Sequence, residues 1–140
     1  MARFPEKWGR RAVVKLVQCI RRRPSLGVDG FRAAWEGYGE RLREVAMELG
    51  ASRVTLWTTL ETPLNDALAA ARGSLQAFDG VAEIAWPAGA AILADAALPA
   101  TRARIASLRA LQEEFADPGR SAFFFVHEQE LLGEVEATAT

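Results

Sequence analysis

Two side chains in this sequence carry chemistry suited to proton transfer or to stabilising a developing negative charge, namely His127 and Tyr38. His127 is the only histidine of the chain and directly follows three phenylalanines and a valine. Histidine titrates near neutral pH, so it suits general acid–base catalysis. The alternative is a structural histidine, hydrogen-bonded or half-exposed at the end of a strand.

Tyr38 belongs to a regular stripe of large apolar residues. The stripe steps three and four residues at a time through Val28, Phe31, Trp35, Tyr38, Leu42, Val45 and Leu49. That spacing predicts an amphipathic helix over residues 28–49. From its face, Tyr38 would donate a hydrogen bond to a substrate carbonyl or enolate, and Gly39 would leave room for that ligand. The alternative is a core tyrosine whose hydroxyl reaches the rim.

Three tryptophans and one aspartate complete the candidate site. We expect Trp35, Trp57 and Trp86 to pack in the core, because aromatic side chains dominate core energetics; the alternative is that some line an apolar cavity. Asp79 precedes a glycine, and we expect it to form a turn through its own backbone. The alternative for Asp79 is a carboxylate at the mouth of a pocket.

The segments that position these side chains alternate between strand and helix patterns. Runs rich in β-branched and aromatic residues predict strands over residues 12–20, 52–60, 81–86 and 121–129. Helices are predicted over residues 28–49, 63–72, 88–97 and from 99 to about 116. Leu64 and Leu68 are the expected buried side of the second helix. The expected buried face of the last helix comprises Leu98, Ile105, Leu108, Leu111 and Phe115.

This order of elements predicts a ferredoxin-like α+β sandwich, βαββαβ, with an inserted short helix. The helices cover one sheet face. The other face is predicted to carry Val13, Val17, Trp57, Phe123 and Phe125, and we expect Lys15 to pair with Glu83 across the sheet. An apolar sheet face is normally buried against a partner. We therefore predict a homodimer with sheets face to face, forming a dimeric α+β barrel.

Composition narrows the class of protein further. The chain has 140 residues, a formal net charge of −1 and one cysteine, so we expect one domain over residues 12–131 in a reducing cytoplasm. Residues 1–11 are predicted to be an N-terminal arm and residues 132–140 a C-terminal tail. Metal-site, nucleotide-loop and hydrolase motifs are absent from the sequence. We expect no metal, no cofactor, no nucleic-acid partner and no membrane span.

Several segments together resemble the EthD domain, a family of the dimeric α+β barrel superfamily. They are the first strand with its basic end and proline, KLVQCIRRRP, the helix core FRAAW, the insertion PLNDALAAARGS, the turn into the third strand FDGVAEIAW and, more loosely, the last strand SAFFFVHEQ. The resemblance covers roughly residues 12–130 in the same order and spacing. It implies a protein of small-molecule degradation or tailoring, associated with oxidoreductases, and it brings Asn65 and Arg72 beside the insertion helix into the candidate site. The alternatives are that Asn65 fixes a loop and Arg72 caps a helix end.

One departure from the family pattern affects the expected chemistry. Family members commonly carry a histidine four residues after the helix tryptophan, and this chain has Gly39 at that place. Two hypotheses follow. The first is a cofactor-independent enzyme acting on a hydrophobic carbonyl- or phenol-bearing molecule, with Tyr38 and His127 as catalytic groups and Trp35, Trp57 and Trp86 as substrate-binding walls. The second is a non-catalytic binding or accessory protein for such a molecule.

Overall fold

The computed structural model describes residues 12–87, 95 and 98–135 of the chain. Four antiparallel strands, β1 (Val14–Ile20), β2 (Arg53–Thr58), β3 (Gly80–Trp86) and β4 (Ala122–His127), form one sheet in the order β2-β3-β1-β4. The helices are α1 (Val28–Glu48), α2 (Pro63–Arg72), α4 (Pro99–Gln112) and the short 3-10 helix η2 (Pro118–Arg120). This topology confirms the predicted ferredoxin-like fold with an inserted helix. The expected N-terminal arm, most of the expected helix over residues 88–97 and the last residues of the tail lie outside the described residues.

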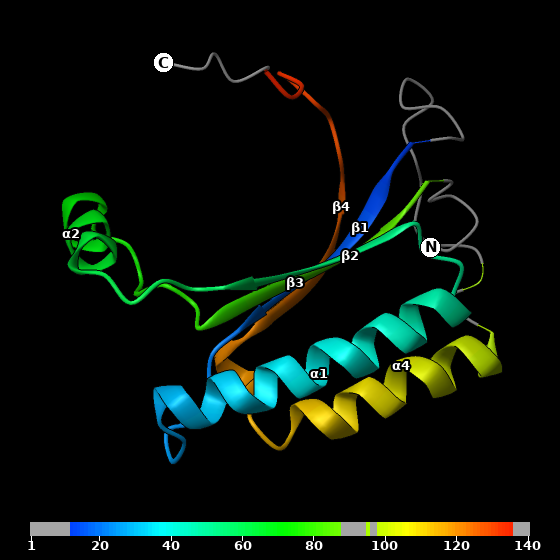
Figure 1. The fold of residues 1–140 in the computed structure, drawn as a ribbon, viewed down its shortest axis with the longest axis horizontal. Helices are drawn as coiled ribbons and strands as arrows, with labels where there is room; N and C mark the ends of the chain where they lie inside the picture. The colour runs from blue at the N-terminus through cyan, green and yellow to red at the C-terminus, as the bar shows by residue number, and fades with distance from the viewer. Residues whose placement is uncertain (1–11, 88–94, 96–97, 136–140) are drawn as a thin grey trace.

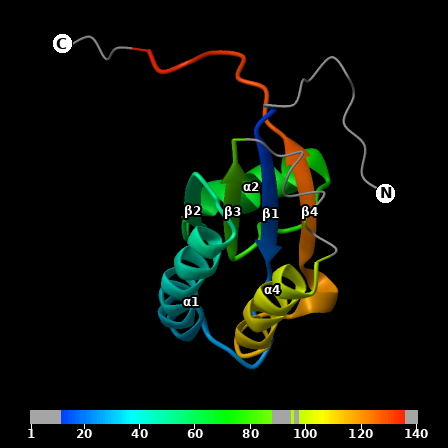
Figure 2. The same ribbon diagram turned by 90° about the vertical axis from the view of Figure 1, so that its right-hand side faces the viewer.

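The two long helices cover one face of the sheet (Figure 1). Figure 2 shows α1 in front of the β2–β3 half and α4 in front of the β1–β4 half. The predicted stripe is the buried face of α1: Phe31, Trp35, Tyr38, Leu42 and Val45 are each at most 2% exposed. Helix α1 ends at Glu48, and Gly50, whose φ of 75° suits glycine, follows its C-cap residue Leu49. Within the described residues, no helix is long and apolar enough to cross a membrane.

A stack of aromatic rings fills the core beneath α1. The rings of Phe31, Trp35 and Tyr38 stack in series with centroids 5.5 Å apart at each step. Phe115, which follows the end of α4, meets all three rings edge-on at 5.2–5.9 Å. Edge-to-face and offset arrangements of this kind are the favourable ones for aromatic pairs. Helix α4 ends at Gln112, four residues before the predicted end, and the turn that follows brings Phe115 into this core.

The strand register shows that one prediction about the sheet faces is wrong. Phe123 pairs with Gln18 and Phe125 with Leu16 on the helix-covered face, whereas Phe124 pairs with Val17 on the open face. Successive side chains of a strand point to opposite faces, so a shift of one residue exchanges the faces of the whole strand. The open face therefore carries Phe124 in place of Phe123 and Phe125. The predicted pairing of Lys15 with Glu83 is confirmed, at 3.6 Å.

Helix α2 stands apart from the two layers, on the opposite side of the sheet from α1 and α4 (Figure 1). Its ends are as predicted: Thr62 caps the first turn by accepting from the Leu64 amide, and Gly73 ends the helix in the left-handed conformation. The predicted burial of Leu64 and Leu68 is wrong, because these side chains are 75% and 58% exposed and only Ala69 is buried. In α4, Leu98 and Ile105 are likewise more exposed than predicted, at 52% and 40%.

Candidate ligand-binding cavity

A cavity of about 440 Å³ lies between the helix-covered face of the sheet and α4. Its apolar wall includes Leu16, Ile84, Trp86, Ile105, Leu108 and Phe125. Two amide side chains, Gln18 and Gln112, also line the cavity. The exposed Arg109 of α4 is a further lining residue and contributes a guanidinium group. Apolar cavities of this size with a few polar groups are typical of small-molecule sites.

The amides belong to a buried polar triad formed by Gln18 on β1, Tyr38 on α1 and Gln112 at the end of α4. The Tyr38 hydroxyl donates to Gln18 Oε1 at 2.5 Å and accepts from Gln112 Nε2 at 2.8 Å. Gln112 Nε2 also donates to Gln18 Oε1 at 3.3 Å. Gln18 and Tyr38 are each 2% exposed. Buried polar groups are costly unless they are hydrogen-bonded, so the triad joins β1, α1 and α4 at one defined geometry.

The environment of Tyr38 determines its protonation state. Burial raises the pKa of Tyr38 to about 12, against smaller opposing effects of its hydrogen bonds with Gln112 and Gln18. The phenol therefore stays protonated across physiological pH. Its proton is directed at Gln18, and Tyr38 is not among the residues that line the cavity. The two glutamines that Tyr38 contacts do line the cavity.

Each glutamine keeps one hydrogen-bonding group that no other part of the described chain engages. For Gln18 this group is the amide nitrogen, a donor, and for Gln112 it is the amide oxygen, an acceptor. Both residues line the cavity. Two residues that line this mainly apolar cavity thus carry an unengaged donor and an unengaged acceptor, which suits a ligand with a carbonyl oxygen or a hydroxyl group.

The tryptophans take three different positions. Trp35 is fully buried and donates from Nε1 to the Trp57 carbonyl at 3.3 Å. Trp86 is 4% exposed, donates to the Leu49 carbonyl at 3.1 Å and forms part of the cavity wall. Trp57 lies on the open sheet face, 55% exposed, and donates to Glu83 Oε2 at 3.2 Å. Trp86 is the one of the three that lines the cavity.

A neighbouring side chain, Leu56, fills the space next to Gly39 on the side that faces β2. A methyl group added at Gly39 would come within 2.9 Å of Leu56 Cδ2. Leu56 on β2 therefore fills the space beside Gly39 that a side chain at this position would need. Gly39 also borders a shallow, open groove between α1 and β2, which is separate from the cavity under α4.

His127 lies at the end of β4, opposite Val14 in the sheet register. Val14 in turn pairs with Trp86, so these three residues share one row across the helix-covered face. His127 is half-buried and is not among the residues that line the cavity. The two predicted catalytic groups, His127 and Tyr38, therefore belong to different surroundings.

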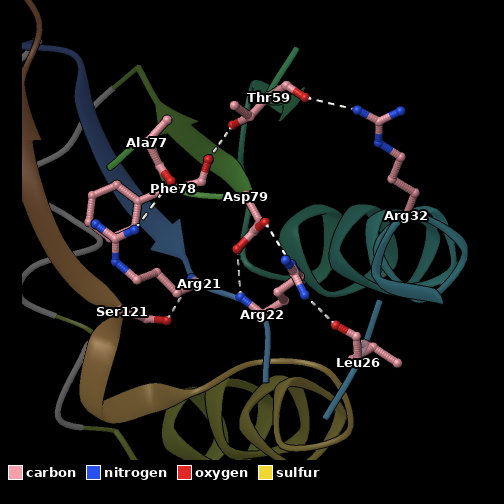
Figure 3. Close-up of polar contacts among 9 residues, drawn as sticks. All are labelled: Arg21, Arg22, Leu26, Arg32, Thr59, Ala77, Phe78, Asp79 and Ser121. Carbon is pink, nitrogen blue, oxygen red and sulfur yellow. Dashed lines mark hydrogen bonds and ion pairs between the residues drawn. The ribbon is translucent and has the colours of Figure 1, made fainter. Parts of the chain in front are cut away.

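The remaining predicted site residues are Asp79, whose contacts Figure 3 shows, and Asn65 and Arg72, which belong to α2. Asp79 accepts from the Arg22 amide at 2.8 Å and from Arg22 Nε at 3.2 Å, so its carboxylate anchors the end of β1. Asn65 donates from its amide nitrogen to the Leu60 carbonyl at 2.9 Å, which fixes the loop before α2. Arg72 is exposed in the last turn of α2. None of these three lines the cavity.

Gln18 and Gln112 were not predicted as site residues. The signal for Gln18 is present in the sequence, because it is the polar member of the row Val14, Leu16, Gln18 and Ile20, which the alternation directs towards the helices. A buried polar residue in such a row needs a partner. Gln112 has no comparable signal, since a glutamine near a helix end is ordinary on a solvated surface. The described residues contain no group of three or more acidic, histidine or cysteine side chains placed to hold a metal ion.

Comparison with known proteins establishes the fold. No family model and no curated protein matches the chain, so the resemblance to the EthD domain stays a prediction. The chain is similar to a solved structure described as a dimeric protein of unknown function with a ferredoxin-like fold, from Bacteroides fragilis. The TM-score is 0.56 at 8% sequence identity, over 83% of this chain and 96% of that chain. This likeness and the observed topology together show a ferredoxin-like α+β fold.

Proposed function

We propose that this protein binds a hydrophobic small molecule bearing a carbonyl or phenolic hydroxyl group in the cavity under α4, without a cofactor. The observation that carries the proposal is the Gln18–Tyr38–Gln112 triad at the edge of an apolar cavity. Two amide groups with unused hydrogen-bonding capacity fix the orientation of a polar substituent, while the apolar wall accommodates a ring system. A role in degradation or tailoring of organic molecules, alongside oxidoreductases, accords with this chemistry and with the EthD resemblance.

Of the two hypotheses drawn from the sequence, the binding or accessory function is the one that the geometry favours. Tyr38 is protonated and committed to Gln18, and His127 stands outside the cavity wall. The enzymatic alternative, proton transfer with enolate stabilisation, is favoured by one observation: a phenol with a pKa of about 12 remains a hydrogen-bond donor and polarises the Gln18 amide.

The proposal is tested with a library of aromatic ketones, phenols and the corresponding hydrocarbons. A ligand that binds the native state raises its melting temperature, so thermal shift followed by calorimetry identifies binders. We expect ketones and phenols to bind and hydrocarbons of equal size to bind at least about tenfold more weakly, because the unpaired amide groups penalise a ligand that offers them nothing. Equal affinity for the hydrocarbons contradicts the proposed polar recognition.

Two variants locate the site. Ile105→Trp fills the cavity from a partly exposed position and should abolish binding, whereas Gln112→Leu should remove the preference for polar ligands. Gln76→Leu changes an exposed glutamine outside the cavity and serves as the matched control. Unchanged binding by Ile105→Trp places the ligand elsewhere. Turnover of any binder, followed by chromatography, distinguishes the enzymatic alternative.

We also propose that the protein is a homodimer that joins the open sheet faces of two copies. Apolar residues of this face include Val17, Phe124 and Val126, and Phe124 is 45% exposed. The similar structure from Bacteroides fragilis is described as dimeric, which supports a homodimer here. Sedimentation velocity at micromolar concentration tests this proposal, and a monomeric mass contradicts it.

A further inference from the structure

Helix α2 and the loops on either side of it carry a set of exposed leucines that the rest of the described chain leaves uncovered. We call these four residues the leucine face: Leu60, Leu64, Leu68 and Leu75. They are 76%, 75%, 58% and 81% exposed. Leu64 and Leu68 are four residues apart, so they lie on one side of the helix. Apolar side chains gathered in this way mark an interaction surface.

The helix also needs a partner for its own stability. A helix of ten residues is marginal in water without tertiary packing, and α2 buries only Ala69. Its N-cap at Thr62 and its left-handed C-cap at Gly73 are both in place, so the segment is built to be helical. What α2 lacks within the described chain is a surface to pack against.

Polar contacts hold the two ends of the segment that carries α2, which we call its base (Figure 3). Arg21 donates to the carbonyls of Gln76 and Ala77 at 2.8 and 3.2 Å, and its guanidinium lies 4.3 Å from the centre of the Phe78 ring. On the other side of the base, the Thr59 amide donates to the Asp79 carbonyl at 3.2 Å and Arg32 donates to the Thr59 carbonyl at 3.1 Å.

These contacts tie the base to the end of β1 and to α1. Helix α2 is therefore held on the open side of the sheet, opposite the two long helices (Figure 1). A molecule seated on the open face would therefore lie on the same side of the sheet as α2 (Figure 1).

The charges on the open face indicate what that molecule is. Lys15 lies 3.0 Å from Glu128 and 3.6 Å from Glu83, and Arg53 lies 3.5 Å from Glu128. Among the described residues of the strands and their ends, these two cations pair with these two anions. A two-fold interface places the same patch on both sides and so must be self-complementary. A face with balanced charges and apolar residues between them satisfies that requirement, whereas a strongly charged partner finds no matching field here.

We infer that the leucine face of α2 docks on a second copy of this chain and supplies a large part of the dimer interface. The inference rests on the proposed homodimer and adds to it a specific element, because the sheet face alone leaves α2 uncovered. Stable dimers bury more than about 1,200 Å² in total, and a projecting helix from each copy extends the contact beyond the sheet.

The test compares dimer dissociation constants by sedimentation over a range of protein concentrations. The double variant Leu64→Glu/Leu68→Glu should weaken the dimer by about 100-fold or more, because two apolar anchors per copy become charged. Met47→Glu is the matched control: Met47 is 65% exposed on α1, on the helix side of the sheet, and its variant should dimerise as the wild type does. Circular dichroism confirms that each variant is folded.

Phe124→Glu separates this inference from the homodimer proposal. If the wild type is monomeric throughout, the homodimer and the docking of α2 are both overturned. If Phe124→Glu breaks the dimer and the leucine variant does not, the homodimer stands and the docking of α2 is overturned. Flotation with phosphatidylcholine vesicles tests a lipid surface as the competing occupant. If the wild type binds vesicles, and the leucine variant loses this binding while its dimer is unchanged, the leucine face binds lipid and the inference is overturned.

Discussion

The indole ring of Trp35 lies directly against the main chain of Gly80, at the start of β3. A methyl group added at Gly80 would lie 2.6 Å from Trp35 Cε2, closer than side-chain carbons approach one another. Both residues are buried. The glycine of the FDG turn is therefore required by the packing of the helix tryptophan and not by the turn geometry, since only Gly50 and Gly73 have positive φ among the described glycines.

Gly80→Ala should lower the free energy of unfolding by about 1–3 kcal/mol, because Trp35 cannot move without disturbing the aromatic stack. Gly37→Ala is the control, since a methyl group there meets nothing within 4 Å. Because alanine is favoured over glycine in the middle of a helix, Gly37→Ala should stabilise the protein by up to about 1 kcal/mol. Urea denaturation of both variants measures the difference, and equal stabilities would show that Trp35 is not in close contact with Gly80.

The raised pKa of Tyr38 predicts a loss of stability at high pH. The folded state holds the phenolic proton to a pKa of about 12, whereas the unfolded chain releases it near the ordinary value of 10.0. The contribution of this proton to the free energy of unfolding is therefore fully present below pH 10. It is lost as the pH rises towards 12, and the total loss is about 2–3 kcal/mol. Tyr38 is the only tyrosine of the chain, so phenolate absorbance reports its titration directly.

Tyr38→Phe provides the reference for that experiment. It leaves the Gln18 and Gln112 amides without the shared hydroxyl, so we expect a cost of about 1–3 kcal/mol near neutral pH. The decline in stability between pH 10 and 12 should be shallower than in the wild type. A wild-type phenol that titrates near pH 10 in the folded protein would contradict the buried triad.

Asp79→Asn tests whether this carboxylate serves the fold or a ligand. Its two hydrogen bonds come from Arg22, and Asp79 does not line the cavity. We expect a loss of about 1–2 kcal/mol in stability, as a charge-assisted hydrogen bond is weakened, and an unchanged affinity for cavity ligands. Asp66→Asn on exposed α2 is the control for charge alone. A selective loss of ligand affinity would place Asp79 in the binding site.

His127→Ala tests the predicted catalytic role of the histidine. Because His127 does not line the cavity, we expect the variant to bind cavity ligands with the wild-type dissociation constant, measured by calorimetry between pH 5 and 8. Val126→Ala, the neighbouring position on β4, controls for local packing. A tenfold loss of affinity or of any turnover in His127→Ala, with Val126→Ala unaffected, would restore the histidine to the functional site.

Local patterns were enough to predict much of this molecule. The three-and-four spacing from Phe31 to Val45 identifies the buried face of α1, since helical period alone determines which side chains share a face. Thr62 and Gly73 mark the ends of α2 because capping is a local interaction. The order of strands and helices indicates the ferredoxin-like topology, which the structure confirms.

Tertiary structure alone decided three further features. The faces of β4 depend on its register with β1, and that register lies in contacts between residues about a hundred positions apart. The exposure of Leu64 and Leu68 depends on where the anchored base directs α2, which no helical period encodes. The triad of Gln18, Tyr38 and Gln112 forms because β1, α1 and α4 converge at one point. Sequence periodicity determines which side chains share a face, whereas long-range packing determines what each face meets.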